Sequence, residues 1–187
     1  PLSLAEQGLD NIVIDMLGLR GGRRSLRRWR EYVDNVVNAT REVTIAVVGK
    51  YSELLDAYKS IHEALNHAGA HHSARVRILS VAAEAIERDG AAESLAGVDG
   101  VLVPGGFGSR GLEGKIAAIE HARRSRIPFL GICLGMHMAV IEFARNVLGL
   151  DGADSTEDNP DTPHPVIHLM EAQKKVMNMG ATMRLGA

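Results

Sequence analysis

The sequence predicts an α/β fold in which helices cover a parallel sheet. Short apolar runs of strand length alternate with amphipathic stretches of helical length along most of the chain. Each run is interpreted as a strand buried on both faces, and the strands are expected at Val43–Val48, Val76–Leu79, Gly100–Val103 and Ile127–Leu130. Because strands that alternate with helices pair through right-handed crossovers, the sheet is expected to be parallel.

The helices follow from the apolar periodicity between and after these strands. They are expected at Leu54–Ala68, Val81–Arg88, Gly111–Arg124 and Leu134–Leu148. In the last of them Met138, Ile141 and Leu148 fall on one stripe, which predicts the face that packs against the sheet. Ligands of parallel sheets bind at the carboxyl ends of the strands, so the loops after Val103 and Leu130 are the expected place for a site.

The two ends of the chain differ in character from its middle. Residues 1–8 could form a short helix, and six arginines occur within the eleven residues 20–30. Such a run could bind nucleic acid or another anionic ligand. Runs of charge without interleaved aromatic residues usually lie at the surface, so we favour a basic linker that leads into a helix through Trp29. After Leu150 turn-forming residues predict a loop, followed by a weak strand near Val166–Met170.

Composition limits the classes of function. The 187 residues are 45% hydrophobic and 4% aromatic, with a formal net charge of −2. This is the composition of a globular protein, and nothing in it predicts binding to nucleic acid or to a membrane. A single cysteine excludes an internal disulfide, and no apolar stretch is long enough to span a membrane, so a cytoplasmic protein is expected.

Cys133, the single cysteine, stands between Gly131 and Gly135, where a predicted strand passes into a predicted helix. Glycine on both sides leaves room for a sharp turn that exposes the sulfur at the carboxyl edge of the sheet. The N-terminus of the following helix stabilises negative charge at that point. The pattern therefore predicts a cysteine nucleophile, and a buried structural cysteine beside turn glycines is the alternative.

A second glycine-marked loop, Pro104–Gly108, follows the predicted strand Gly100–Val103. Consecutive glycines let the backbone turn its N–H groups toward a ligand, so this loop could hold an oxyanion. A ligand-free turn and a phosphate loop are the alternatives, but the chain has no Gly-x-x-x-x-Gly-Lys-Ser/Thr motif, and nucleotide binding is not assigned. Because both glycine-marked loops leave sequential strands at one edge, we predict that this loop supplies backbone donors to Cys133.

Several motifs together resemble one family. The stretch Leu130–Met136 resembles the nucleophile elbow of class I glutamine amidotransferases. Further motifs resemble the amidotransferase domain of the CTP synthase family: Val48–Tyr51, Asp56–Tyr58, Val103–Gly108, Arg110–Gly114, Phe143–Arg145, Asp154–Glu157 and Thr182–Gly186. The resemblance covers residues 42–187 and implies a flavodoxin-like, three-layer parallel sheet of the class I glutamine amidotransferase type. It also implies that residues 1–41 are the end of a synthetase domain and the interdomain linker.

The resemblance implies an activity and a set of partners. Cys133 would attack the side-chain amide of L-glutamine, form a glutamyl thioester and release ammonia. A separate synthetase domain would use that ammonia to aminate UTP to CTP at the expense of ATP. For the whole enzyme the resemblance implies ATP, Mg²⁺, GTP as an activator and a homotetramer. For this domain it implies no cofactor, no metal, no nucleic acid and no membrane.

The resemblance also assigns roles to single residues. The backbone N–H groups of Gly105 or Gly106 and of Leu134 would hold the oxyanion. Glutamine would be bound by Gly106, Leu134, Gly135, Met136, His137 and Glu157. The carboxylate of the last residue in this set would face the ammonium group of the substrate. Phe107 and Arg110 would lie on a loop beside the site that is linked to activation by GTP.

The chain departs from the family pattern in its arginine-rich segment, which is more basic than the family's linker, and at two further points. His137 stands where the family has glutamine, and it could still donate a hydrogen bond to the substrate. The general base and its orienting acid in the family form a His-x-Glu pair, and none of the eight histidines here is followed two residues later by glutamate. We therefore expect an amidotransferase domain that is incomplete at its C-terminus, and low activity for this chain alone.

Two other functions remain open from the sequence. A cysteine hydrolase of the same fold could act on a peptide or a γ-glutamyl substrate, and it would not release ammonia from glutamine. A catalytically inactive regulatory or structural domain is favoured by the missing His-x-Glu pair and by His137.

Overall fold

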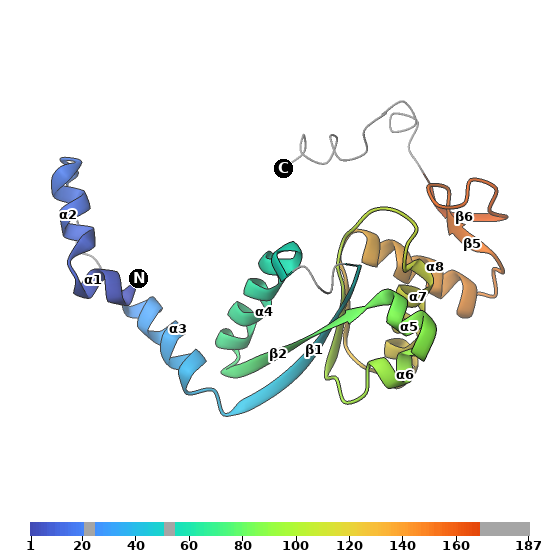
Figure 1. Cartoon of the computed structure of the whole chain (residues 1–187), viewed down its shortest axis with the longest axis horizontal. Helices are drawn as coiled ribbons and strands as arrows, with labels where there is room; N and C mark the ends of the chain where they lie inside the picture. Colours follow the sequence, from blue (N-terminus) through green and yellow to red (C-terminus); the bar gives the residue numbers. More distant parts are fainter. Residues whose placement is uncertain (21–24, 51–54, 169–187) are drawn as a thin grey trace. The chain divides into compact units, whose positions relative to one another are not determined.

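The computed structural model describes residues 1–20, 25–50 and 55–168 (Figure 1). These residues form two compact units: the described parts of Pro1–Val43 and Tyr58–Arg77 make the first, and those of Thr44–Ala57 and Ile78–Ala187 make the second. Among the sequence motifs, Tyr51 and Thr182–Gly186 lie outside the described residues, as do the last two residues of the strand predicted near Val166–Met170.

In the first unit, short helices precede the first strand, and a longer helix follows it. They are α1 (Leu2–Glu6), α2 (Leu9–Met16), α3 (Arg27–Val37) and α4 (Lys59–His71). The helices predicted at the start of the chain and through Trp29 are confirmed, whereas α2 was not predicted. On α3, Tyr32 meets Trp29 and His67 of α4 edge to face, with ring centroids 6.0 and 5.4 Å apart. The arginines 27, 28 and 30 are exposed on α3, as expected for a surface segment.

The helix predicted at Leu54–Ala68 begins later than expected. A short 3₁₀ turn, η1 (Leu55–Tyr58), comes first, and α4 then runs from Lys59 to His71. Apolar periodicity does not distinguish a 3₁₀ turn from the first turn of an α-helix, which explains the shift.

The described residues form a four-stranded sheet with the order β2-β1-β3-β4. Its strands are β1 (Arg41–Gly49), β2 (Ala74–Ala82), β3 (Gly100–Val103) and β4 (Phe129–Gly131). β1 pairs in parallel with β3, and β3 pairs in parallel with β4. This is the flavodoxin-like order, in which the strand order reverses between β1 and β3. The predicted α/β class with a parallel sheet is confirmed.

The core of the second unit lies between the sheet and its helices, α5 (Ala83–Asp89), α6 (Ala91–Ser94), α7 (Leu112–Ser125) and α8 (Leu134–Asn146). Helix α7 packs against both α5 and α8 (Figure 1). Branched side chains from β1 and β3 meet the inner faces of α7 and α8 in one cluster, which includes Val48, Val101, Val103, Ile116, Ile119, Met138 and Ile141. The strands therefore hold α7 and α8 in register with the carboxyl ends of β3 and β4.

Two expectations about burial are wrong. The strands β2 and β4 are not buried on both faces, since Leu79 and Leu130 are exposed. Both strands lie at the outer positions of the described sheet, where one side has no neighbouring strand. Leu148 does not join the buried stripe of Met138 and Ile141, because α8 ends at Asn146 and the Leu148 side chain is 60% exposed.

A second, smaller sheet follows α8 in the segment that was predicted to be a loop. β5 (Ala153–Ser155) pairs in parallel with β6 (His164–Ile167). β6 confirms the strand expected near Val166, but β5 was missed because three residues among turn formers carry no periodicity. No helix in the parts of the chain described above has the length and apolar character needed to cross a membrane.

Candidate functional site

Cys133 lies in a strained turn at the end of β4. It is the N-cap of α8, with φ of 53° and ψ of −109°, a backbone conformation that non-glycine residues rarely adopt. The Ile132 N–H donates to the Val103 carbonyl oxygen at 2.9 Å, and the Met136 and His137 N–H groups donate to the Cys133 carbonyl oxygen at 2.9 and 3.1 Å. These bonds hold the turn from both sides. The side chain is exposed, as predicted.

The two glycines beside the cysteine are required by close approach of backbone to backbone. A Cβ atom on Gly131 would lie 2.6 Å from the carbonyl carbon and oxygen of Gly135. On Gly135 it would lie 2.0 Å from the carbonyl oxygen of Val103. Because backbone atoms cannot swing aside as a side chain can, only glycine fits at either position. The Gly-x-Cys-x-Gly pattern thus fixes how closely α8 approaches β3 and β4.

The glycine-marked loop after β3 lies directly against the turn at Cys133. A Cβ atom built on Gly105 would be 3.3 Å from Cys133 Cβ and 3.8 Å from Cys133 Sγ. One built on Gly106 would be 3.8 Å from Leu134 Cδ2. The adjacency predicted from the shared edge of the sheet is therefore confirmed. That these glycines hold an oxyanion stays a prediction.

A backbone donor is available at the start of α8. The N–H of Gly135 donates to the Ile132 carbonyl oxygen at 3.0 Å, and those of Met136 and His137 donate to Cys133. Leu134 is the first residue of α8, and in the described part of the chain its N–H has no protein acceptor. An open donor at a helix N-terminus favours negative charge beside the sulfur.

Three side chains tie the loop at residues 104–111 to its surroundings. Lys50 Nζ, at the end of β1, donates to the Phe107 carbonyl oxygen at 3.1 Å. Arg110 donates from Nη2 to the Lys50 carbonyl oxygen at 3.2 Å, and its Nε lies 2.7 Å from Glu84 Oε1 on α5. These contacts lie beside the strand-order reversal between β1 and β3, where ligands bind in such folds. Sequence reasoning missed Lys50 and Glu84, because nothing in the chain order pairs them with Phe107 and Arg110.

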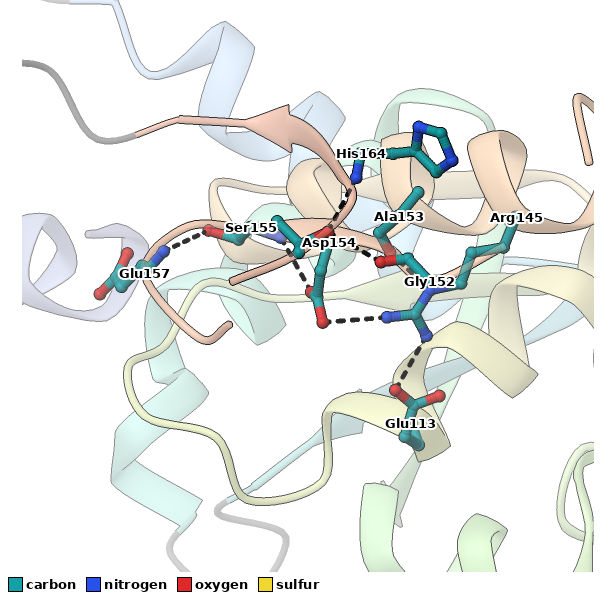
Figure 2. Close-up of polar contacts among 9 residues, drawn as sticks. Glu113, Arg145, Gly152, Ala153, Asp154, Ser155, Glu157 and His164 are labelled. Carbon is teal, nitrogen blue, oxygen red and sulfur yellow. Dashed lines mark hydrogen bonds and ion pairs between the residues drawn. The ribbon is translucent and has the colours of Figure 1, made fainter. Parts of the chain in front are cut away.

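Glu157 lies on the turn after β5 with an exposed side chain. Its N–H donates to Ser155 Oγ at 3.1 Å, and the Ser155 N–H donates to Asp154 Oδ1 at 2.8 Å (Figure 2). Within the described residues, no hydrogen bond or ion pair joins the Glu157 carboxylate to the turn at Cys133. These hydrogen bonds hold the backbone at Glu157 in place. The role of Glu157 in binding glutamine stays a prediction.

The residue after Glu157 has a perturbed carboxyl group. Partial burial raises the pKa of Asp158 above its usual 3.8, and the negative charges of Glu157 and Asp154 raise it further. The positive charge of Lys115, and that of His137 when protonated, act in the opposite direction on the same pKa. Asp158 is thus within electrostatic reach of the first turn of α8, where His137 lies half-buried.

Lys115 is a second group that sequence reasoning missed. It lies in the first turns of α7, and only 3% of its surface is exposed. Burial lowers its pKa, the positive charge of Lys50 lowers it further, and the charges of Glu84, Asp158 and Glu87 oppose both effects. A charged residue in an amphipathic helix is ordinarily assigned to the solvated side, so the sequence carries no signal for this burial.

Met136 was predicted to bind glutamine, but its side chain lies in a separate groove. It lines an apolar groove of about 360 Å³ on the outward face of α8, together with Ala139, Val140, Phe143, Ala144, Leu148, Leu150 and Val166. The contact of Met136 with glutamine therefore stays a prediction, and the position of its side chain does not support it. Among the described residues there is no cluster of three or more His, Cys, Asp or Glu side chains that could hold a metal ion.

Comparisons with known proteins agree with this geometry. The family model described as "Glutamine amidotransferase class-I" matches residues 53–187. The chain is 55% identical to the CTP synthase of Desulfitobacterium hafniense (strain Y51), and 56% identical to that of Halalkalibacterium halodurans. Each match covers 100% of this chain and 35% of the relative. The chain therefore spans about a third of the length of these curated relatives.

A solved structure is similar as well. The Trypanosoma brucei CTPS glutaminase domain with bound acivicin is 42% identical, with a TM-score of 0.65, over 70% of this chain and 51% of the other. The family model takes in most of the chain, including β3, β4 and the turn that carries Cys133. Sequence and fold therefore agree that the chain belongs to the class I glutamine amidotransferase family.

Proposed function

We propose that this chain is the glutaminase part of a glutamine-hydrolysing CTP synthase and that Cys133 is its nucleophile. One observation carries the proposal. The exposed thiol of Cys133 sits in a strained turn, against the backbone of Gly105 and next to the N–H of Leu134, which has no acceptor among the described residues. A sulfur nucleophile between backbone donors is the arrangement that acyl transfer requires. The similarity to CTP synthases over the whole chain supports the choice of substrate.

In the proposed reaction the Cys133 thiolate attacks the amide carbon of the glutamine side chain. The C–S bond forms, and the carbonyl electron pair moves onto oxygen. The N–H groups of Gly105 or Gly106 and of Leu134 would stabilise that oxyanion. As the intermediate collapses, the C–N bond breaks, and the nitrogen takes a proton and leaves as ammonia. Water then hydrolyses the γ-glutamyl thioester to glutamate and restores the thiol.

Substrate recognition in this proposal uses the residues around the turn. Glutamine would contact Gly106, the first turn of α8 from Leu134 to His137, and the carboxylate of Glu157. The proton transfers need a base, and the His-x-Glu pair of the family pattern does not occur within residues 1–187. The nucleophile and its donors are present in this chain, so their chemistry can be measured separately from the acid–base steps.

The wider reaction is also proposed. Ammonia would pass to a synthetase domain that aminates UTP with ATP and Mg²⁺, and GTP would activate the glutaminase near Phe107 and Arg110. The whole enzyme would be a cytoplasmic homotetramer. The similarity to CTP synthases supports these proposals, and the chain spans only 35% of those relatives.

The test is covalent labelling of the only cysteine by a chloroketone analogue of L-glutamine. We expect mass spectrometry to find the adduct on Cys133, and we expect excess L-glutamine, but not D-glutamine, to slow the reaction. The Cys133→Ser variant is the control and should stay unlabelled. Labelling that L-glutamine does not slow would overturn the proposal. The proposal would also be overturned if the whole proposed CTP synthase still released ammonia from glutamine when it carried Cys133→Ser.

A further inference from the structure

Arg145, in the last turn of α8, joins segments that are distant in the sequence. Its Nη1 lies 2.9 Å from Glu113 Oε1 on α7, and its Nη2 lies 3.1 Å from Asp154 Oδ2 on β5. Its Nε donates to the Ala153 carbonyl oxygen at 2.6 Å (Figure 2). All three partners are met by different positions of the guanidinium fork, a geometry that a lysine cannot reproduce.

Burial strengthens one of these contacts more than the others. The side chains of Arg145 and Asp154 are only 20% and 19% exposed, whereas Glu113 is 68% exposed. Charges that are mostly shielded from water attract each other more strongly than exposed charges do. The pair of Arg145 with Asp154 is therefore the main anchor, and Glu113 is an accessory partner.

Hydrogen bonds connect the Arg145–Asp154 pair to the backbone of Glu157. The second carboxylate oxygen of Asp154, Oδ1, accepts the N–H of Ser155 at 2.8 Å. Ser155 Oγ, in a side chain that is 2% exposed, accepts the N–H of Glu157 at 3.1 Å. A continuous series of hydrogen bonds thus runs from Arg145 to the backbone of the residue that is proposed to bind the substrate ammonium group (Figure 2).

The same helix carries the nucleophile at its other end. Cys133 caps the N-terminus of α8, and Arg145 lies twelve residues further on, a distance of about 18 Å along the axis. The segment anchored at Asp154 packs on the same helix, since both β5 and β6 contact α8. One rigid helix therefore relates the reacting sulfur to the loop of Glu157.

We propose that Arg145 is a positioning residue for glutamine recognition, which acts through Asp154 and Ser155 to set where Glu157 stands relative to Cys133. The inference rests on the proposed function, in which Glu157 binds the ammonium group of glutamine. Loss of Arg145 or Ser155 then weakens the binding of glutamine-like ligands. The intrinsic reactivity of the thiol is unchanged, because the turn at Cys133 has its own supports.

The experiment separates binding from reactivity in the full 187-residue chain. Labelling by the chloroketone analogue of L-glutamine is followed over a range of concentrations, which yields the half-saturating concentration and the maximal rate. Iodoacetamide, which lacks an amino-acid group, reports the reactivity of Cys133 alone. Arg145→Met and Ser155→Ala should raise the half-saturating concentration about tenfold, the effect of losing roughly one hydrogen bond to a charged group. The maximal rate and the iodoacetamide rate should stay within about twofold of wild type.

Conservative and matched variants sharpen the result. Asp154→Asn keeps an oxygen acceptor for Ser155 but loses the charge facing Arg145, so its effect should be intermediate. Arg123→Lys is the matched control, because Arg123 pairs with Glu142 between α7 and α8 and none of its described contacts reaches the loop of Glu157. It should leave the half-saturating concentration at the wild-type value.

Three outcomes decide between the ideas. If Arg145→Met and Ser155→Ala saturate like wild type, the positioning role is refuted while the proposed function stands. If the half-saturating concentration and the iodoacetamide rate change together, Arg145 serves only the general stability of the fold, and the proposal also fails. If the wild-type chain neither saturates nor is protected by L-glutamine, the proposed function itself fails. Should Arg145→Met not fold, Arg145→Lys and Ser155→Ala decide the question.

Discussion

The turn at Cys133 and the ion-pair network at Arg145 occupy the two ends of α8, but they are built by different means. At the turn, backbone packs on backbone so closely that Gly135 has no room for a single Cβ atom. At Arg145, charged side chains from three segments meet at 2.9 and 3.1 Å, and Arg145 also donates to the backbone carbonyl oxygen of Ala153 at 2.6 Å. Close backbone packing is disrupted by a single added methyl group, whereas a network of charges loses stability gradually as its contacts are removed one by one. The turn at Cys133 is thus fixed rigidly, whereas the loop of Glu157 can be tuned.

Replacement of Gly135 by alanine should have the largest effect. The new Cβ would lie 2.0 Å from the Val103 carbonyl oxygen, so α8 must move away from β3. We expect the free energy of unfolding to fall by more than about 3 kcal/mol, as measured by urea denaturation. Gly106→Ala is the control, because its Cβ would make only an ordinary contact at 3.8 Å with Leu134. A loss below about 1 kcal/mol for Gly135→Ala would show that the turn is adaptable.

Replacement of Arg145 by methionine should have a smaller effect on stability. It removes charged hydrogen bonds from a mostly shielded site, and we expect a loss of about 2 kcal/mol. Because the site is shielded, the loss should persist at about 1 M salt, where exposed ion pairs are screened. Arg110→Met offers the contrast, since its pair with Glu84 is 58% and 36% exposed and should matter little in salt. If salt removes the Arg145 effect as well, the network is not shielded.

Backbone strain at Cys133 predicts a still smaller difference in stability, between two variants of that residue. Cys133 has a positive φ that glycine adopts without strain, so Cys133→Gly should be more stable than Cys133→Ala by about 1 kcal/mol. The difference between the urea midpoints of the two variants measures this. Equal midpoints would mean that the turn stores no backbone strain.

The smallest effect concerns the pH dependence at Asp158. Its pKa is raised in the folded protein by burial and by neighbouring negative charges, so the folded state binds a proton at a higher pH than the unfolded chain does. Its contribution to stability therefore becomes more favourable as the pH falls through the interval above 3.8. Asp158→Asn should be slightly more stable than wild type at pH 7, and the gap should close on acidification. A less stable variant at pH 7 would show that attraction to Lys115 and His137 outweighs burial.

Steric features were predictable from the sequence because they leave local marks. Gly131 and Gly135 bracket the cysteine in the chain itself, and their spacing alone is enough to predict the turn. The strand Gly100–Val103 and the first residue of α8, Leu134, coincide with their predicted positions, since glycines and apolar runs mark these boundaries. The contact of Gly105 with Cys133 followed from the parallel order of the strands.

Charged contacts were not predictable, because they join residues that no local pattern relates. Arg145 meets Glu113 across two helices, and each residue alone resembles an ordinary surface charge. The burial of Lys115 depends on how α7 packs rather than on its own sequence. β5 escaped detection since Ala153–Ser155 is too short for periodicity. The side of the candidate site near Glu157 therefore depends on tertiary packing, whereas the side at Cys133 is marked in the local sequence.

Because Cys133 and Arg145 lie at opposite ends of one helix, the number of residues between them fixes the position of one relative to the other. One inserted residue would rotate Arg145 by about 100° around the helix axis and shift it by about 1.5 Å. The guanidinium would then face neither Glu113 nor Asp154, although every residue of both sites was still present. An insertion or deletion within α8 would thus separate the two sites although all their residues were kept. We expect the protein to tolerate changes of chain length only in the surface turns beyond the ends of α8.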